Sequence, residues 1–200
     1  MFANKTHKQA DEALKNGKIE KSIELYSRAL EESPNECNIL SDRGVAYLHA
    51  NQKENSLTDF NRAVELQPDY GYRYASRAFA RNNFGDIDGA IRDYEKAVEL
   101  DPDDPVGYNN LGLLLEQKGY QKEADERFKR ADTLSEMEDK LLNVIDKLEE
   151  KPSTPLEPNE NTHEISEGND SAVSEFKKLF TSKTQLKAFF AFLKNGFKIK

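Results

Sequence analysis

The stretch that decides the fold is residues 70–103, which read YGYRYASRAFARNNFGDIDGAIRDYEKAVELDPD. In its second half, Ile91, Tyr94 and Val98 recur at spacings of three and four, the pattern of an amphipathic helix. Gly85 separates this half from a first half of similar length. The stretch therefore predicts two helices joined by a short turn.

This pattern returns along the chain at a constant step of 34 residues. An aromatic column contains Tyr26, Phe60, Tyr94 and Phe128. Columns of small residues contain Ala10, Gly44, Ala78 and Gly112, then Ser22, Ser56, Ala90 and Ala124, then Ala29, Ala63, Ala97 and Ala131. The first three units end at Pro34, Pro68 and Pro102, and Glu136 takes the place of proline in the fourth. Such a repeat predicts a stack of helix pairs.

The small columns have a packing reason. Two helices approach to about 8–10 Å only where the side chains between them allow it. Gly44 and Gly112 lie in the middle of predicted helices, where glycine costs about 1 kcal/mol relative to alanine. We infer that close packing offsets this cost.

The repeat resembles the tetratricopeptide-repeat (TPR) family over residues 3–138. The resemblance implies an all-α fold, a right-handed superhelix (an α–α solenoid), with a concave groove lined by the first helix of each unit. The four units are residues 3–36, 37–70, 71–104 and 105–138. In residues 139–150, apolar side chains at helical spacing predict a C-terminal capping helix.

The positions that face the groove in this family can be carried onto the present sequence. They give a candidate protein-binding groove of His7, Asp11, Asp42, Tyr72, Phe79, Asn82, Asn109, Asn110 and Leu113. Asparagine amides both donate and accept hydrogen bonds, which suits the backbone of an extended or helical segment. Two alternatives stay open: His7 as ordinary polar surface, and Asn82 as a residue that caps or solvates a helix end.

One TPR subclass binds the acidic C-terminus of heat-shock chaperones through a clamp of Lys, Asn and Arg. The matching positions here hold His7, Asp11, Asp42, Tyr72 and Ser76. Because Asp11 and Asp42 would repel a carboxylate, we predict no binding of this kind.

The chain changes character after residue 150. Residues 151–174 are rich in Pro, Ser, Asn and Glu and predict a flexible acidic linker. With five acids and one lysine the linker has a net charge of −4, whereas seven lysines and one glutamate give residues 175–200 a net charge of +6. Since the whole chain is −8, residues 1–150 have −10.

Residues 175–200 predict a basic, Phe-rich, amphipathic helical tail. Its apolar side chains recur at spacings of three and four and include Phe176, Phe180, Phe189, Phe190, Leu193 and Phe197. Three interpretations of the tail are open. It docks on the repeat body or across a dimer, it folds on an external partner, or it binds an anionic membrane surface.

Composition excludes several functional classes. An acidic chain is repelled by phosphate backbones, which argues against a nucleic-acid partner. Cys37 is the only cysteine, the three histidines lack ligand spacing, and no phosphate-binding loop is found. We therefore expect no catalysis, metal or cofactor. With no signal peptide and no run of about 18 apolar residues, the expected location is the cytoplasm.

The predicted function is that of an adaptor or scaffold that binds a protein or peptide in the groove. The alternative is a peripheral membrane-associated adaptor that is tethered by the basic aromatic tail.

Overall fold

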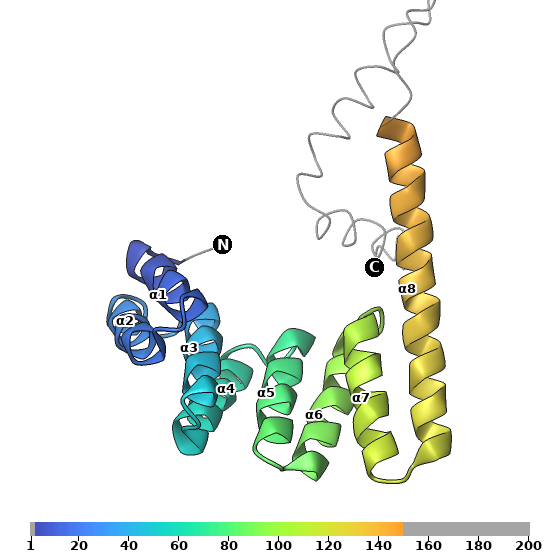
Figure 1. The fold of residues 1–200 in the computed structure, drawn as a ribbon, viewed down its shortest axis with the longest axis horizontal. Coiled ribbons are helices and arrows are strands. Elements are labelled where there is room, and N and C mark those ends of the chain that lie inside the picture. Colours follow the sequence, from blue (N-terminus) through green and yellow to red (C-terminus); the bar gives the residue numbers. More distant parts are fainter. Residues whose placement is uncertain (1–2, 150–200) are drawn as a thin grey trace, which may run out of the picture. The chain divides into compact units, whose positions relative to one another are not determined.

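The computed structural model describes residues 3–149, with side chains described as far as residue 143. Within this part, the chain forms eight helices and no strand (Figure 1). They are α1 (Lys5–Lys15), α2 (Ile19–Glu32), α3 (Cys37–His49), α4 (Lys53–Leu66), α5 (Gly71–Asn83), α6 (Ile87–Leu100), α7 (Pro105–Gln117) and α8 (Gln121–Glu149). The predicted linker, 151–174, and tail, 175–200, lie outside the described residues.

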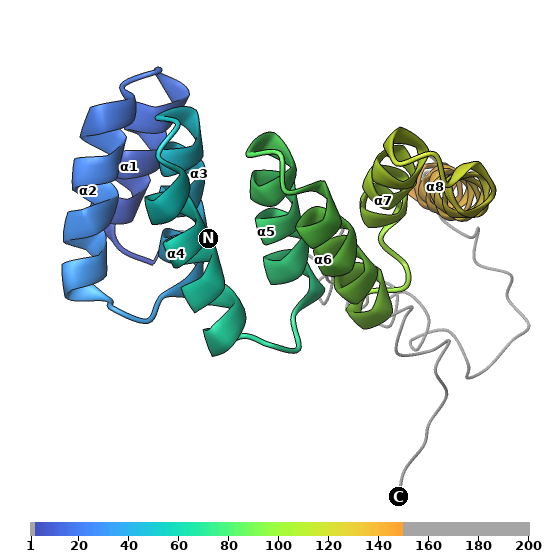
Figure 2. The ribbon, with the colours of Figure 1, turned by 90° about the horizontal axis from the view of Figure 1, so that it is seen from below.

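The helices are arranged as four pairs, α1–α2, α3–α4, α5–α6 and α7–α8, and each pair is one unit of the sequence repeat. The second helix of each of the first three pairs also packs on the first helix of the next, so that the pairs stack in a row (Figures 1 and 2). This arrangement confirms the predicted all-α solenoid. We call α1, α3, α5 and α7 the A helices, and the second helices the B helices.

Three of the four turns within the pairs contain a glycine. Gly17, Gly85 and Gly119 have φ angles of 71°, 80° and 86°, in the left-handed region that favours glycine. The remaining turn has Asn51 at the equivalent position, with φ 56°. Asparagine tolerates this conformation better than most residues, so the turn survives the substitution.

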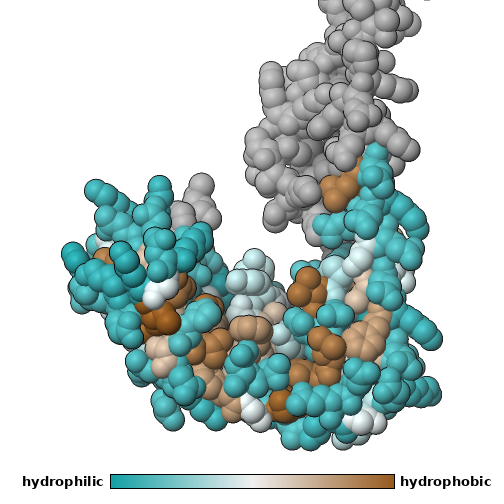
Figure 3. Space-filling view, in the orientation of Figure 1, coloured by the Kyte–Doolittle hydropathy of each residue, from teal (hydrophilic) through white to brown (hydrophobic). Residues whose placement is uncertain are grey.

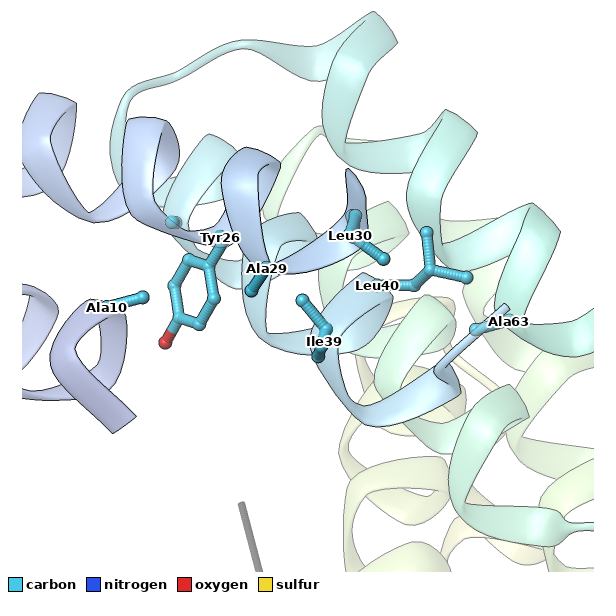
Figure 4. Close-up of a cluster of buried hydrophobic side chains, with 8 residues drawn as sticks. Ala10, Tyr26, Ala29, Leu30, Ile39, Leu40 and Ala63 are labelled. Atoms are coloured by element: carbon cyan, nitrogen blue, oxygen red, sulfur yellow. The ribbon is translucent and has the colours of Figure 1, made fainter. Parts of the chain in front are cut away.

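The core of each unit is an aromatic ring from the B helix set against a small residue of the A helix. Figure 4 shows Tyr26 of α2 beside Ala10 and Ala29, and all three are fully buried. In the second unit, a β-carbon at Gly44 would lie 3.0 Å from the Phe60 ring. In the fourth unit, a β-carbon at Gly112 would lie 2.6 Å from the Phe128 ring. The close approach of the two helices thus favours glycine, more strongly at Gly112 than at Gly44.

A partly buried arginine joins successive units. Arg77 of α5 makes a two-pronged contact with Asp93 of α6, at 2.9 and 2.7 Å, and also donates to Asn61 of α4 at 2.9 Å. The planar guanidinium matches this geometry. One unit earlier, Arg43 and Asp59 form the same pair at 2.7 and 2.8 Å.

The residues predicted to form a capping helix, 139–150, continue the last helix of the repeat as far as Glu149. α8 runs without a break over 29 residues. Glu136 occupies the position at which proline ends the other units, so nothing stops the helix there. Figure 1 shows α8 continuing past the end of α7, with Leu141 and Leu142 partly buried.

The glycine contacts give a stability test. We expect Gly112→Ala to lower the free energy of unfolding by about 1 kcal/mol or more, because the new methyl group must displace the Phe128 ring. This loss should outweigh the gain in helix propensity of about 1 kcal/mol. Urea unfolding of the full chain, followed by circular dichroism, measures the effect.

Gly44→Ala is the matched comparison, because its methyl group would meet the Phe60 ring at a distance 0.4 Å longer, 3.0 Å instead of 2.6 Å. We expect a smaller loss, or none. A Gly112→Ala protein that is as stable as the wild type would contradict the packing described above.

Candidate protein-interaction surface

Large apolar side chains are exposed on one face of α5 and α7. Tyr72 and Phe79 of α5 are 57% and 50% exposed, and Val106 and Leu113 of α7 are 65% and 49% exposed. In each helix the two residues are seven positions apart, about two turns, so they lie on the same side. We call these four residues the apolar patch. Figure 3 shows apolar side chains over α3, α5 and α7, whereas the α1–α2 end is mostly hydrophilic.

The predicted groove residues lie on all four A helices. Tyr72, Phe79 and Leu113 belong to the patch, and Asn109 is exposed beside them on α7. Partial burial is found for the remaining predicted residues other than His7, namely Asp11, Asp42, Asn82 and Asn110. Val106 was not predicted, although its column, 34 residues after Tyr72, was already apparent in the sequence.

His7 is a correction, because it is neither polar surface nor an accessible groove residue. Its side chain is buried, and its Nε2 lies 2.7 Å from Oδ2 of Asp42 on α3. Its Nδ1 accepts a hydrogen bond from the Ala3 backbone at 3.2 Å, so Nε2 carries the proton that faces the carboxylate. The packing of α1 against α3 buries the ring, and His7 links these helices.

Two carboxylates make the α1–α3 end of the face anionic. Burial raises the pKa of the Asp42 carboxyl, the hydrogen bond from His7 opposes this effect, and the nearby charge of Asp11 adds to it. Asp11 pairs with Lys15 at 2.7 Å, but the Lys15 side chain is 72% exposed. The A-helix face therefore combines an acidic end on α1 and α3 with an apolar patch on α5 and α7.

The buried hydroxyl of Tyr26 lies near this acidic end, and Tyr94 is the equivalent residue in the third unit. In the third unit, the Tyr94 hydroxyl is hydrogen-bonded to Asn110, and burial raises the pKa of Tyr94 to about 12. The equivalent pair near the N-terminus is Tyr26 and Asp42, but Asp42 is engaged by His7. Among the described residues, the buried Tyr26 hydroxyl has no hydrogen-bond partner.

Arg73 of α5 is a structural residue that the sequence analysis missed. Its side chain is buried and donates to Asn38 at 2.7 Å, to Ser41 at 3.0 Å and to Gln67 at 2.7 Å. It thereby ties α5 to α3 and to the segment between α4 and α5. A signal was present, because Arg73 stands in the column of Ile39, which is fully buried.

The same guanidinium positions one end of the apolar patch. It lies 5.3 Å from the ring centre of Tyr70 and 5.6 Å from that of Tyr72. These are cation–π distances, and the two rings lie 6.0 Å apart. Tyr72 is therefore held in place although more than half of its surface is exposed.

Within residues 3–143, no three His, Cys, Asp or Glu side chains gather to hold a metal, and Cys37 is buried. None of the helices within residues 3–149 has the length and apolarity of a membrane span.

Family models match the chain over most of the repeat region. Models described as tetratricopeptide repeat match residues 7–71 and 106–136, and one described as TPR repeat matches residues 84–119. The chain belongs to the tetratricopeptide-repeat family. TPR units are protein-interaction modules, so membership supports a role as a protein–protein interaction scaffold. No curated protein sequence matches the chain.

Solved TPR structures share the fold. A MamA RS-1 double mutant is 21% identical, with a TM-score of 0.61, over 67% of this chain and 75% of that one. MamA AMB-1 is 24% identical, with a TM-score of 0.55, over 66% and 71%. The first TPR of Spaghetti (RPAP3), bound to the HSP90 peptide SRMEEVD, is 25% identical, with a TM-score of 0.52, over 56% and 89%.

The two buried tyrosines allow a matched test of the A-helix face. We expect Tyr26→Phe to raise the free energy of unfolding by up to about 1 kcal/mol, because it removes a buried hydroxyl that lacks a partner. Tyr94→Phe should lower it by about 1 kcal/mol, because it breaks the bond to Asn110.

Thermal and urea unfolding of both full-length variants measures the difference. Phe60 and Phe128 in the same column indicate that the ring alone is tolerated. Equal losses in the two variants would mean that Tyr26 has a hydrogen-bond partner in solution, against the arrangement described here.

Proposed function

We propose that the protein is an adaptor that binds a segment of another protein on its A-helix face, and that it acts by binding and not by catalysis. The observation that carries this proposal is the apolar patch. A single exposed hydrophobic residue is ordinary, but four large ones in two repeat columns form a surface of the kind that binds partners. The exposed amide of Asn109 lies among them and suits a peptide backbone.

The partner segment is extended or helical, with bulky apolar side chains that contact the patch. It has little net negative charge, because Asp11 and Asp42 lie at the other end of the face and residues 1–150 are strongly acidic. The same charge argues against nucleic acid. We place the protein in the cytoplasm.

The RPAP3 structure contains the HSP90 peptide SRMEEVD, but we propose that the present protein does not bind such an acidic terminus. Asp11 and Asp42 stand at clamp positions, and one oxygen of Asp42 lies 2.7 Å from His7 Nε2. Tyr72 and Ser76 stand where the family's clamp has cations. A carboxylate ligand would meet repulsion and no compensating charge.

The alternative function is that of a peripheral membrane-associated adaptor. It rests on the basic, aromatic sequence of residues 175–200, which lie outside the described residues.

Substitution of the patch tests the proposed binding face. With the full chain as bait in a quantitative pull-down, we expect the double variant Phe79→Glu and Leu113→Glu to lose captured partners at least tenfold, since central apolar anchors dominate interfaces. Arg92→Glu is the control, because it changes the net charge equally on an exposed position of α6. Equal capture by all three proteins, or loss in the control, would contradict the assignment.

The acidic-peptide prediction has its own measurement. Isothermal titration of SRMEEVD into the full chain should give no saturable binding in the micromolar range, and the RPAP3 TPR serves as a positive control. Micromolar binding that is lost on raising the salt concentration would show a carboxylate site that the residues above do not provide.

A further inference from the structure

We propose that the A-helix face is occupied in the free protein by the chain's own C-terminal segment, residues 175–200. This inference rests on the proposed function and extends it, because an external partner would then compete with the tail. Three properties of the chain support it: opposite charge, matching apolar spacing and sufficient reach.

Charge favours this occupant over most others. Residues 175–200 have a net charge of +6, and residues 1–150 have −10. On the A-helix face, Asp11 and Asp42 supply carboxylates close enough for the charge of Asp11 to raise the pKa of Asp42. The ion-pair partner of Asp11, Lys15, is largely exposed and can be replaced by a lysine of the tail.

The apolar residues of the tail have the spacing of the patch. Leu186 and Leu193 are seven residues apart, as are Phe190 and Phe197. Tyr72 and Phe79 have this same separation, which on a helix is about 10.5 Å. A helical tail would therefore present two apolar rows with the period of the A helices, as in helix-in-groove recognition.

The linker is long enough for the tail to fold back. Residues 151–174 supply 24 residues. A flexible chain of this length has a root-mean-square span of about 25–30 Å and an extended reach of about 80 Å. The 29 residues of α8 cover about 44 Å, so the tail can return along the whole helix.

Tethering makes such docking effective even if the contact itself is weak. A short flexible linker gives an effective concentration in the millimolar range. A tail that binds with micromolar affinity in solution would then fill its own site almost completely. A partner must therefore displace it, and the tail limits binding until that partner is abundant or the tail is modified.

A labelled peptide of residues 175–200 tests this occupancy by fluorescence anisotropy. Three full chains are compared, namely the wild type, a tail variant with Phe189→Glu and Phe190→Glu, and the same tail variant that also has Phe79→Glu and Leu113→Glu. We expect the peptide to bind the tail variant at least tenfold more tightly than the wild type, whose site is filled. The variant with the changed patch should not bind.

The control is a full chain with Thr184→Glu and Asn195→Glu in the tail. Like the Phe variant it gains two negative charges, but on the polar side of the predicted helix. The affinity of this control for the labelled peptide should be closer to that of the wild type than the affinity of the Phe189→Glu, Phe190→Glu variant is. Because the substituted patch residues are exposed, we expect each variant to fold, and circular dichroism verifies this.

Other outcomes would overturn the inference in distinguishable ways. In one outcome, the peptide binds the wild type and the tail variant with equal affinity and fails to bind the patch variant. The proposed binding face would then stand, but the tail would not occupy it in the free protein. Peptide affinity that is unchanged by the patch substitutions would mean that the tail binds a surface other than the apolar patch. A concentration-dependent dimer that needs Phe189 and Phe190 assigns the tail to a second copy. Strong pelleting of the wild type with phosphatidylserine vesicles assigns it to a membrane surface.

Discussion

The structure depends on one contact that recurs in every unit, a small residue of the A helix against an aromatic ring of the B helix. The contact sets how closely the two helices approach, and so fixes the orientation of the unit in the stack. Where the residue is glycine, a single methyl group would not fit without movement of the ring. The four pairs are Ala10–Tyr26, Gly44–Phe60, Ala78–Tyr94 and Gly112–Phe128. With the B helix fixed on one side, the opposite side of each A helix is free to carry function.

Polar contacts also join successive units. Arg77 and Asp93 are only 15% and 5% exposed, and such a pair is costly to break because the remaining charge is left buried. The fourth unit does not continue the series, since Leu111 replaces the arginine and Arg127 replaces the aspartate. Nε of Arg127 is buried without a partner among the described residues. The contact between the third and fourth units therefore lacks this buried pair and combines apolar packing with a more exposed ion pair, Lys118 with Asp88 at 2.8 Å.

Sequence periodicity predicted most of the fold and part of the candidate site. The 34-residue columns indicate which residues face the core, and the resemblance to the TPR family was needed to name Tyr72, Phe79 and Leu113 as groove residues. His7 could not be placed, because its burial depends on Asp42, which is 35 residues away. Arg73 was missed for a similar reason, since its partners come from α3 and the α4–α5 connection. α8 continues past the fourth unit because Glu136 stands where proline ends the other units.

In the proposed arrangement, the exposed side of α5 and α7 is a binding face that the tail fills in the free protein. A photo-reactive amino acid in place of Phe79 in the full chain, with cross-linked peptides identified by mass spectrometry, tests it most directly. We predict intramolecular cross-links from position 79 to residues 175–200, and none from the same probe at the exposed position 92 of α6. Cross-links to the tail from position 92 but not from position 79 would contradict the claim.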